Sequence, residues 1–376
     1  HWGTLEVPGP QFNTNIGSQK DIFNSLALVW DIPFLWNGLA ENSTQASWNY
    51  DQIDYTDLNG NSLHTLHTFF GASNWAFYVN SLLEIRLKID GTLAYLQSTN
   101  CTPSDILLPM AGFQLGGNLS LPHNINLYPS VKIVTNSSTW MPVPKIGFEK
   151  QINNSSKLTF NGFGIFTFPT LNQLYWADSA FASGNKNLEN EKGWGADIGF
   201  YAQNSEVEFS GTAYTAWYQN KIQWATVQGK SMATNVGEAA YFGGSLQTKW
   251  KPTTSLLLSL SYDCNATFLL TGDLTLSDNR RIMYTPLHTA SFETRYTNKK
   301  YSLSLIGSYT GKQYLSNLNA AFIDPYFLLD FYGTYYLGEK LTIKGSVINL
   351  MNVSFYRVEN YPMPGISVSL GLTYEF

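Results

Sequence analysis

Charged residues are scarce in this sequence. Asp, Glu, Lys and Arg make up 13% of 376 residues, against about 25% in an average soluble protein. A chain with so few charges has difficulty covering a surface that faces water. The apolar fraction of 44% excludes a disordered chain, and the net charge of -5 provides no basic patch, so a nucleic-acid partner is not expected.

Long apolar runs are missing as well. No stretch resembles the run of ~18 apolar residues that a transmembrane helix needs, and the most apolar segment, residues 23–39, is interrupted by Asn24, Asp31 and Pro33. The sequence also has only two cysteines, Cys101 and Cys264, which form neither a metal-binding spacing nor a disulfide framework. A single bridge and two free thiols remain alternatives.

Apolar and polar residues alternate along many segments. At the C-terminal end the apolar face comprises Val368, Leu370, Leu372, Tyr374 and Phe376, and the opposite face comprises Ser367, Ser369, Gly371, Thr373 and Glu375. Strands of ~9–11 residues with this period are typical of transmembrane β-barrels. The same alternation occurs in residues 79–90, 206–217, 255–262 and 290–297.

The connections between these strands switch between long and short. Reading back from the C-terminal end, the long ones are 350–365, 311–325, 263–286, 219–237 and 167–192, and the short ones are 338–340, 298–300, 251–254, 204–205 and 151–155. Outer-membrane barrels have short periplasmic turns and longer outside loops. Apolar and polar residues also alternate in the strands of a soluble β-sandwich. A soluble sandwich made from this sequence, however, would have too few charged residues on its surface.

The sequence therefore predicts an all-β fold, an antiparallel transmembrane β-barrel with about 16–17 visible strands. Before residue 151 we expect strands at 23–30, 63–71, 75–89, 92–98, 111–121, 125–134 and 143–150. Asp90-Gly91 is a sequence typical of a tight hairpin. We interpret residues 1–376 as a single domain.

Several segments resemble those of TonB-dependent outer-membrane receptors, in the same order and over about residues 127–376. They are Phe168-Pro169-Thr170-Leu171-Asn172-Gln173-Leu174-Tyr175-Trp176, Gly184-Asn185-Lys186-Asn187-Leu188-Glu189-Asn190-Glu191, Ile222-Gln223-Trp224, Asn235-Val236-Gly237-Glu238-Ala239, Tyr284-Thr285-Pro286-Leu287-His288 and Tyr361-Pro362-Met363-Pro364-Gly365. They are similar to segments of cobalamin and siderophore receptors. Ile366 stands where the family has Arg, and Lys186 and Asn190 stand where it has Pro.

The resemblance implies the C-terminal portion of a family barrel of about 22 strands, with the N-terminal plug domain absent from this chain. It implies TonB-dependent uptake of a scarce nutrient such as cobalamin or an iron-siderophore, by ligand capture and gated transport. It also implies the outer membrane of a Gram-negative-type bacterium as the location. A passive outer-membrane pore, or a structural or adhesin barrel without a plug, is the alternative.

The partners that the resemblance implies are outer-membrane lipid, a small-molecule ligand, the TonB system through the missing plug, and the barrel-assembly machinery. That machinery would read Tyr374 and Phe376 at the end of the last strand. Transport by binding needs no chemistry, so we expect neither an enzyme nor a cofactor.

Aromatic residues on two long connections are the candidate ligand-binding residues: Tyr175, Trp176, Tyr218 and Trp224. Large rings give contact area at a low entropy cost, which suits a flat or macrocyclic ligand. Anchoring at the membrane interface is the alternative role for these rings. If the chain belongs to a receptor, we expect the loops 167–192 and 219–236 to lie together over the same mouth, because they join neighbouring strand pairs.

No catalytic or metal-binding constellation is recognisable in the sequence. His64 and His67 would share a face only on a helix, and on the expected strand their side chains point to opposite sides. We therefore expect no metal site.

Overall fold

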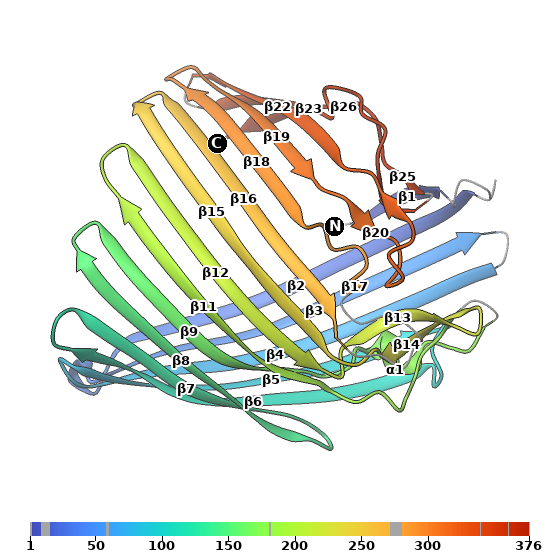
Figure 1. Cartoon of the computed structure of the whole chain (residues 1–376), viewed down its shortest axis with the longest axis horizontal. Coiled ribbons are helices and arrows are strands. Elements are labelled where there is room, and N and C mark those ends of the chain that lie inside the picture. Colours follow the sequence, from blue (N-terminus) through green and yellow to red (C-terminus); the bar gives the residue numbers. More distant parts are fainter. Residues whose placement is uncertain are drawn as a thin grey trace. The chain divides into compact units, whose positions relative to one another are not determined.

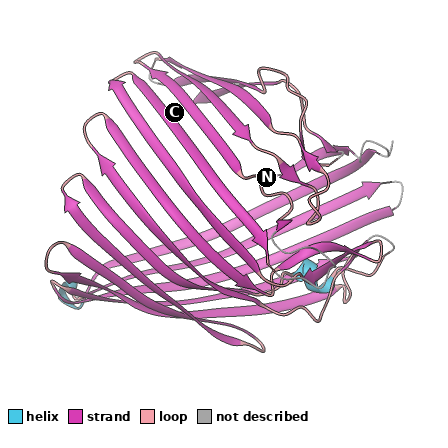
Figure 2. Cartoon of the chain, in the orientation of Figure 1, coloured by secondary structure: helices cyan, strands magenta, loops and turns pink. Residues whose placement is uncertain are grey.

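A computed structural model provides the structure. It describes residues 2–8, 16–57, 60–179, 182–270, 280–338, 340–359 and 361–375. The chain divides into two compact units. The first comprises residues 1–150, 160–196 and 217–238, and the second comprises residues 151–159, 197–216 and 239–376. Strands dominate both of them (Figure 2).

In the first unit, each long strand pairs in antiparallel fashion with the next one in the sequence (blue to green in Figure 1). These strands are β1 (Trp2–Pro8), β2 (Ile16–Leu35), β3 (Ala40–Asp57), β4 (Gly60–Asn80), β5 (Leu83–Ser98), β6 (Asp105–Leu121), β7 (Ile125–Asn136) and β8 (Trp140–Asn153). The short elements are η1 (Trp36–Gly38), α1 (Leu171–Tyr175), β10 (Ala182–Ser183), β13 (Ile222–Val227) and β14 (Lys230–Asn235).

The second unit repeats this meander (yellow to red in Figure 1). Its long strands are β15 (Ala239–Thr253), β16 (Leu256–Leu269), β18 (His288–Thr297), β19 (Tyr301–Thr310), β22 (Tyr326–Leu337), β23 (Leu341–Ile348) and β26 (Ser367–Tyr374). Its short strands are β17 (Arg280–Arg281), β20 (Gln313–Tyr314), β21 (Phe322–Ile323), β24 (Tyr356–Val358) and β25 (Tyr361–Pro362). Four strands contribute residues to both units: β8, β9 (Ser156–Thr167), β11 (Glu191–Gln203) and β12 (Val207–Gln219).

The two faces of the strands differ as the alternation predicts. On the polar face of β5, Arg86 Nε lies 2.5 Å from Glu84 Oε1. In the second unit, Ser346 and Ser369 share a hydrogen bond of 2.7 Å across β23 and β26, while Leu370, the residue after Ser369, is 78% exposed on the other face. An apolar row left open on one face is what a bilayer would cover.

Asparagine side chains shape several of the short turns. Asn80, Asn204 and Asn298 each accept hydrogen bonds from the backbone N–H groups two and three residues ahead, and Asn153 accepts one from Ser155. This Asx-turn geometry reverses the chain within a few residues. The expected short connections 298–300 and 204–205 therefore lie where the sequence placed them.

Two expectations about the first 150 residues are wrong. Asp90-Gly91 forms no hairpin, because β5 continues through both residues and pairs them with Gly71 and Ala72 of β4. The chain reverses earlier, at Asn80, inside the segment 75–89 that we expected to be one strand. The strand β3 was not expected at all, because Asn, Gln, Ser and Asp are frequent in it.

The long connections 167–192, 219–237, 311–325 and 350–365 follow the strands that were expected to precede them. The expected connection 263–286 starts later than predicted, because β16 continues to Leu269. In the described part of the chain, no helix is long and apolar enough to cross a membrane.

Candidate functional site

The long connection after β9 begins with a short helix, α1, which is capped at its start. Thr170 Oγ1 accepts a hydrogen bond from the backbone N–H of Gln173 at 3.3 Å, and Gln173 Oε1 accepts one from the backbone N–H of Thr170 at 2.8 Å. This reciprocal capping box satisfies two backbone donors at the helix start. The first family-like segment therefore has a structural role here.

The end of α1 is fixed against the connection between β5 and β6. The Trp176 ring stacks on His64 with 6.2 Å between centroids, and the Tyr175 carbonyl accepts a hydrogen bond of 2.9 Å from Thr102 N. Tyr175 and Leu171, together with Leu66, pack against a small buried apolar cluster formed by Leu96, Cys101 and Ile106. The loop thus lies on a defined surface of the first unit.

A Gly-Asn pair then returns the loop to the helix. Gly184 N donates to the Trp176 carbonyl at 2.9 Å, and Asn185 N donates to the Gln173 carbonyl at 2.7 Å. A Cβ atom on Gly184 would lie 2.6 Å from Trp176 N, so only glycine fits. Asn185 Nδ2 also reaches the Ala233 carbonyl at 3.2 Å, which links this loop to the next one.

Glu189 and Asn235 exchange hydrogen bonds between the two loops. Glu189 N donates to Asn235 Oδ1 at 2.9 Å, and Asn235 Nδ2 donates to the Glu189 carbonyl at 3.0 Å. The Glu189 carboxylate also accepts from Asn220 Nδ2 at 2.5 Å. The amide side chain of Asn235 therefore bonds both the N–H and the C=O of Glu189, as the backbone of a neighbouring strand would.

Glu191 provides the most buried of these contacts. Its carboxylate accepts a hydrogen bond of 2.7 Å from Ile222 N and lies 3.0 Å from Lys221 Nζ. The Glu191 side chain is 8% exposed and that of Lys221 is 21% exposed. Removing one member of such a pair leaves a buried charge without compensation, so Glu191 fixes the base of the second loop.

The second loop is a hairpin formed by β13 and β14, with Trp224 of β13 opposite Ala233 of β14. The strand β14 also pairs in parallel with β10 of the first loop, Ala182 opposite Ser231. An ion pair between Lys230 and Asp178 adds a further link. We expected these two loops to lie together, and these pairings confirm it. The described residues 168–179, 182–191 and 220–237 are called the loop assembly below.

The four candidate ligand-binding rings occupy different parts of the first unit. Tyr175, Trp176, Tyr218 and Trp224 are all half-buried. Lys186 Nζ lies 5.7 Å from the centre of the Tyr175 ring, and Lys221 Nζ lies 5.1 Å from that of Tyr218. Tyr175 and Trp176 are adjacent at the end of α1, Trp224 is on the hairpin, and Tyr218 is in β12. Their role in ligand binding stays a prediction.

The sequence did not reveal which residues hold the loops in place. Asn185, Glu189, Glu191 and Asn235 lie in the family-like segments, but their partners are more than thirty residues away or on the backbone of another loop. The available signal was the density of Asn and Glu in two loops that also carry aromatic rings.

The remaining candidate residues lie elsewhere. Tyr374 ends β26 opposite Leu341, and Phe376 lies outside the described residues. Cys101 and Cys264 are free thiols. His64 bonds Ser98 and His67 bonds Trp48, so the two histidines have separate surroundings. Within the described ranges, no group of three or more His, Cys, Asp or Glu side chains could hold a metal ion.

Comparisons with known proteins agree with this geometry. The curated vitamin B12 transporter BtuB of Photobacterium profundum is 26% identical to this chain over 245 residues, which are 64% of this chain and 38% of that protein.

 The chain thus spans well under half the length of this curated relative.

Two solved structures have the same fold over almost the whole chain. The siderophore receptor PirA of Pseudomonas aeruginosa is 14% identical, with a TM-score of 0.70 over 97% of this chain and 64% of that one. The copper transporter OprC is also 14% identical, with a TM-score of 0.77 over 96% of this chain and 66% of that one. At these identities the likeness shows the fold alone.

The names of these relatives are those of receptors and transporters, which agrees with the prediction of a non-enzymatic protein. A sequence model of the family described as "TonB dependent receptor-like, beta-barrel" matches residues 4–350. Since this match covers most of the chain, the chain belongs to the TonB-dependent receptor-like β-barrel family.

Proposed function

We propose that this chain forms the barrel portion of an outer-membrane receptor that takes up a scarce nutrient, such as cobalamin or an iron-siderophore. The observation that carries the proposal is the loop assembly, which holds Tyr175, Trp176 and Trp224 on two loops fixed to each other. Family membership and the relative named as a vitamin B12 transporter support it.

Capture relies on rings that are fixed in place before the ligand arrives. Because Asn185, Glu189 and Glu191 tie the loops together, less ordering entropy is lost when a ligand binds. A flat corrin or iron chelate gains contact area from stacking on the rings, and the rings lose little freedom.

Transport then depends on partners. We propose that a plug domain gates the barrel and contacts the TonB system. The row of alternating residues in β26, ending in Tyr374 and followed by Phe376, serves as the signal for the barrel-assembly machinery. The open apolar row of Leu370 and Leu372 faces membrane lipid.

Ligand binding by the complete receptor tests this proposal. We would express the gene product that contains this chain and measure its binding of cobalamin and of iron siderophores, for the wild type and for Trp224→Ala. Trp224 is preferred to Trp176, because the Trp176 ring also packs on His64 and its loss would loosen the loop. We expect a large loss of affinity at normal surface abundance.

The matched control is Trp140→Ala, which removes a ring that is 73% exposed at the start of β8, outside the loop assembly. Its ligand affinity should equal that of the wild type. An unchanged affinity in Trp224→Ala, for every ligand that the receptor binds, would contradict the capture role.

A further inference from the structure

Two glycines open a groove on one face of the first unit. Gly162 and Gly164 lie two residues apart in β9, and a space of about 560 Å³ extends over them, across β8, β9 and the ends of β11 and β12 that belong to this unit. A Cβ atom on Gly162 would approach no atom closer than 3.7 Å, and the φ angle of this residue is outside the left-handed region. Neither packing nor backbone conformation therefore requires glycine here, and the missing side chain leaves room for an occupant.

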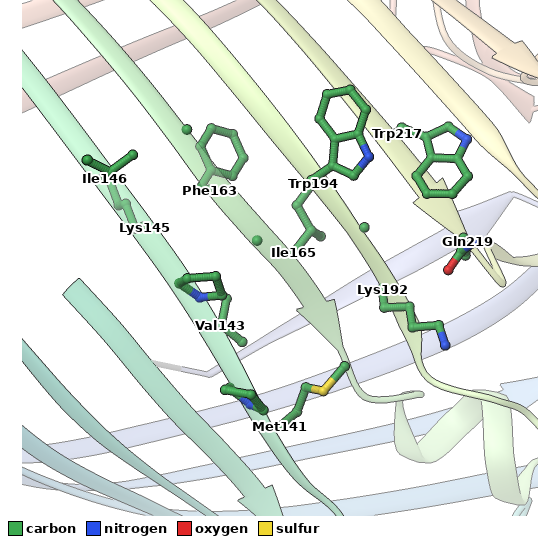
Figure 3. A pocket seen from close by; sticks show the side chains of 15 residues that line it. Met141, Val143, Lys145, Ile146, Phe163, Ile165, Lys192, Trp194, Trp217 and Gln219 are labelled. Atoms are coloured by element: carbon green, nitrogen blue, oxygen red, sulfur yellow. The ribbon is translucent and has the colours of Figure 1, made fainter. Parts of the chain in front are cut away.

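Large apolar side chains border this groove. In Figure 3, Ile146 of β8 lies on one side, and Trp194 and Trp217 lie on the other. The centroids of the two indole rings are 6.4 Å apart, and Ile146 and Trp194 are 51% and 54% exposed. Exposed apolar walls of this kind suit a hydrocarbon chain.

The groove lies on the face of the sheet that we assign to lipid. A Cβ atom on Gly147 would lie 3.1 Å from Asn161 Oδ1, and successive residues of a strand face opposite sides. Asn161 therefore lies on the polar face, whereas Ile146 and the groove lie on the apolar one. A hydrocarbon chain that enters this groove comes from the bilayer.

One end of the groove is polar and is directed toward the outside loops. Lys192 and Gln219 lie at this end in Figure 3, beyond the two tryptophans. Lys192 follows the long connection from β9, and Gln219 precedes the hairpin of β13 and β14. Lys192 is exposed and, among the described residues, forms no ion pair. Aromatic rings mark the level of the headgroups in membrane barrels, so Lys192 lies at the level of the headgroups on the cell-surface side.

The lipid on the cell-surface side of an outer membrane is lipopolysaccharide. Its membrane anchor, lipid A, carries several acyl chains on a phosphorylated disaccharide, whereas glycerophospholipids occupy the periplasmic leaflet. The lipid that meets Lys192 is therefore lipid A. This step rests on the outer-membrane location that the proposed function includes.

We propose that the groove binds one lipid A unit of lipopolysaccharide, with an acyl chain over Gly162 and Gly164 and a phosphate beside Lys192. The volume is within the range of about 300–1,000 Å³ that ligand sites show. A basic side chain at the edge of an apolar membrane surface attracts a phosphate headgroup, and the Gln219 amide beside it offers a donor and an acceptor to sugar hydroxyls. This lipid site is separate from the loop assembly, to which nutrient capture is assigned.

Lipid retention by the purified complete receptor tests the proposal. The receptor would be delipidated in detergent, mixed with lipid A or with fully dephosphorylated lipid A, and examined by native mass spectrometry. We expect wild type to retain lipid A in preference to the dephosphorylated form by about fivefold, the effect of one lysine near a membrane surface. Phosphatidylglycerol, which is anionic but has another headgroup, should be retained less than lipid A.

The phosphate part of the proposal is tested at Lys192. Lys192→Gln should abolish the preference for the phosphorylated form. Lys299→Gln is the matched control, because it removes an exposed lysine from a short turn outside the groove, and it should keep the preference.

Gly162→Leu tests the acyl-chain part, because it fills the groove where a Cβ atom has ordinary contacts. It should lower the retention of both forms of lipid A several-fold. Gly71→Leu is the matched control, since nothing lies within 4 Å of a Cβ atom there and Gly71 is outside the groove.

Any one of four results would overturn the proposal. Wild type would retain both forms of lipid A equally, or would retain phosphatidylglycerol as well as lipid A. Alternatively, Lys192→Gln would keep the preference, or Gly162→Leu and Gly71→Leu would retain lipid A equally. Lys192 is exposed, so its variant keeps the test valid even where the leucine variant folds poorly. Nutrient binding by the same preparation is a separate measurement, so failure of the lipid site and failure of nutrient capture are distinguished.

Discussion

In the first unit, β5 and the loop assembly both carry rows of polar side chains, but they use them differently. Along β5, Glu84 and Arg86 pair with each other two residues apart on one face of a strand. In the loop assembly, the Glu189 carboxylate accepts from the Asn220 side chain and the Glu191 carboxylate accepts from Ile222 N, and both partners are more than thirty residues away. The strand tolerates the substitution of one polar residue on this face by another. Each loop contact, in contrast, depends on one particular donor or acceptor atom.

This difference predicts where substitutions matter. A strand is stabilised by its backbone pairing and by having polar residues on one face and apolar residues on the other. Only the replacement of an apolar residue by a polar one, or the reverse, is therefore costly. A loop has few backbone pairs, and a polar side chain that satisfies a buried group has no substitute.

The largest expected effect concerns the orientation of the turns in the membrane. The short turn 298–300 should face the periplasm and the long connection 311–325 the cell surface. In intact cells, a membrane-impermeant thiol reagent should label Leu318→Cys and not Lys299→Cys. Labelling of Lys299→Cys and not of Leu318→Cys would show that the barrel has the opposite orientation, which would contradict the prediction. The native thiols give a low background, since Cys101 is buried and Cys264 half-buried.

The next effect concerns Glu191. Glu191→Ala leaves Ile222 N and Lys221 without their partner, which we expect to cost about 3–5 kcal/mol locally. Hydrogen exchange of β13 and β14 should accelerate strongly while that of β4 and β5 does not change. Glu206→Ala, an exposed carboxylate at a short turn, is the control. Equal protection of the hairpin in both variants would refute the role of Glu191.

A smaller effect concerns the faces of β26. Leu370→Arg places a charge on the lipid face and should cost about 2–4 kcal/mol at the midplane. Thr373→Arg lies on the opposite face and should be tolerated much better. Urea unfolding from lipid vesicles measures both. Equal losses of unfolding free energy would mean that the faces are wrongly assigned.

The smallest expected effect is that of deleting Phe376. Deleting it should lower the amount of receptor in the outer membrane without changing its synthesis, because the assembly signal is weakened. Immunoblots of whole cells and of outer-membrane fractions measure the two amounts. Unchanged abundance in the membrane would argue against this signal.

The sequence predicts the strands better than the loops, for a physical reason. Alternation is a local property, so β26 and β18 can be recognised from their own residues. It fails in β3, whose two faces are both rich in polar residues, and at Asp90-Gly91, where pairing with β4 prevails over the local preference for a turn.

The loop assembly depends on contacts that are distant in sequence. Asn185 reaches Ala233, and Glu189 reaches Asn235. Neither pair leaves a periodic signal, so the family-like segments marked the correct residues without showing what they do. The prediction that the two loops lie together rested on their neighbouring strands, and that part is confirmed.

Nutrient uptake tests the central proposal most directly. Cells in which the complete gene product containing this chain is the sole candidate receptor would be supplied with labelled cobalamin or with an iron siderophore, with and without a functional TonB system. The proposal predicts uptake above that of cells lacking the receptor, falling to their level when TonB is lost. Uptake that persists unchanged without TonB would contradict it and favour a passive pore.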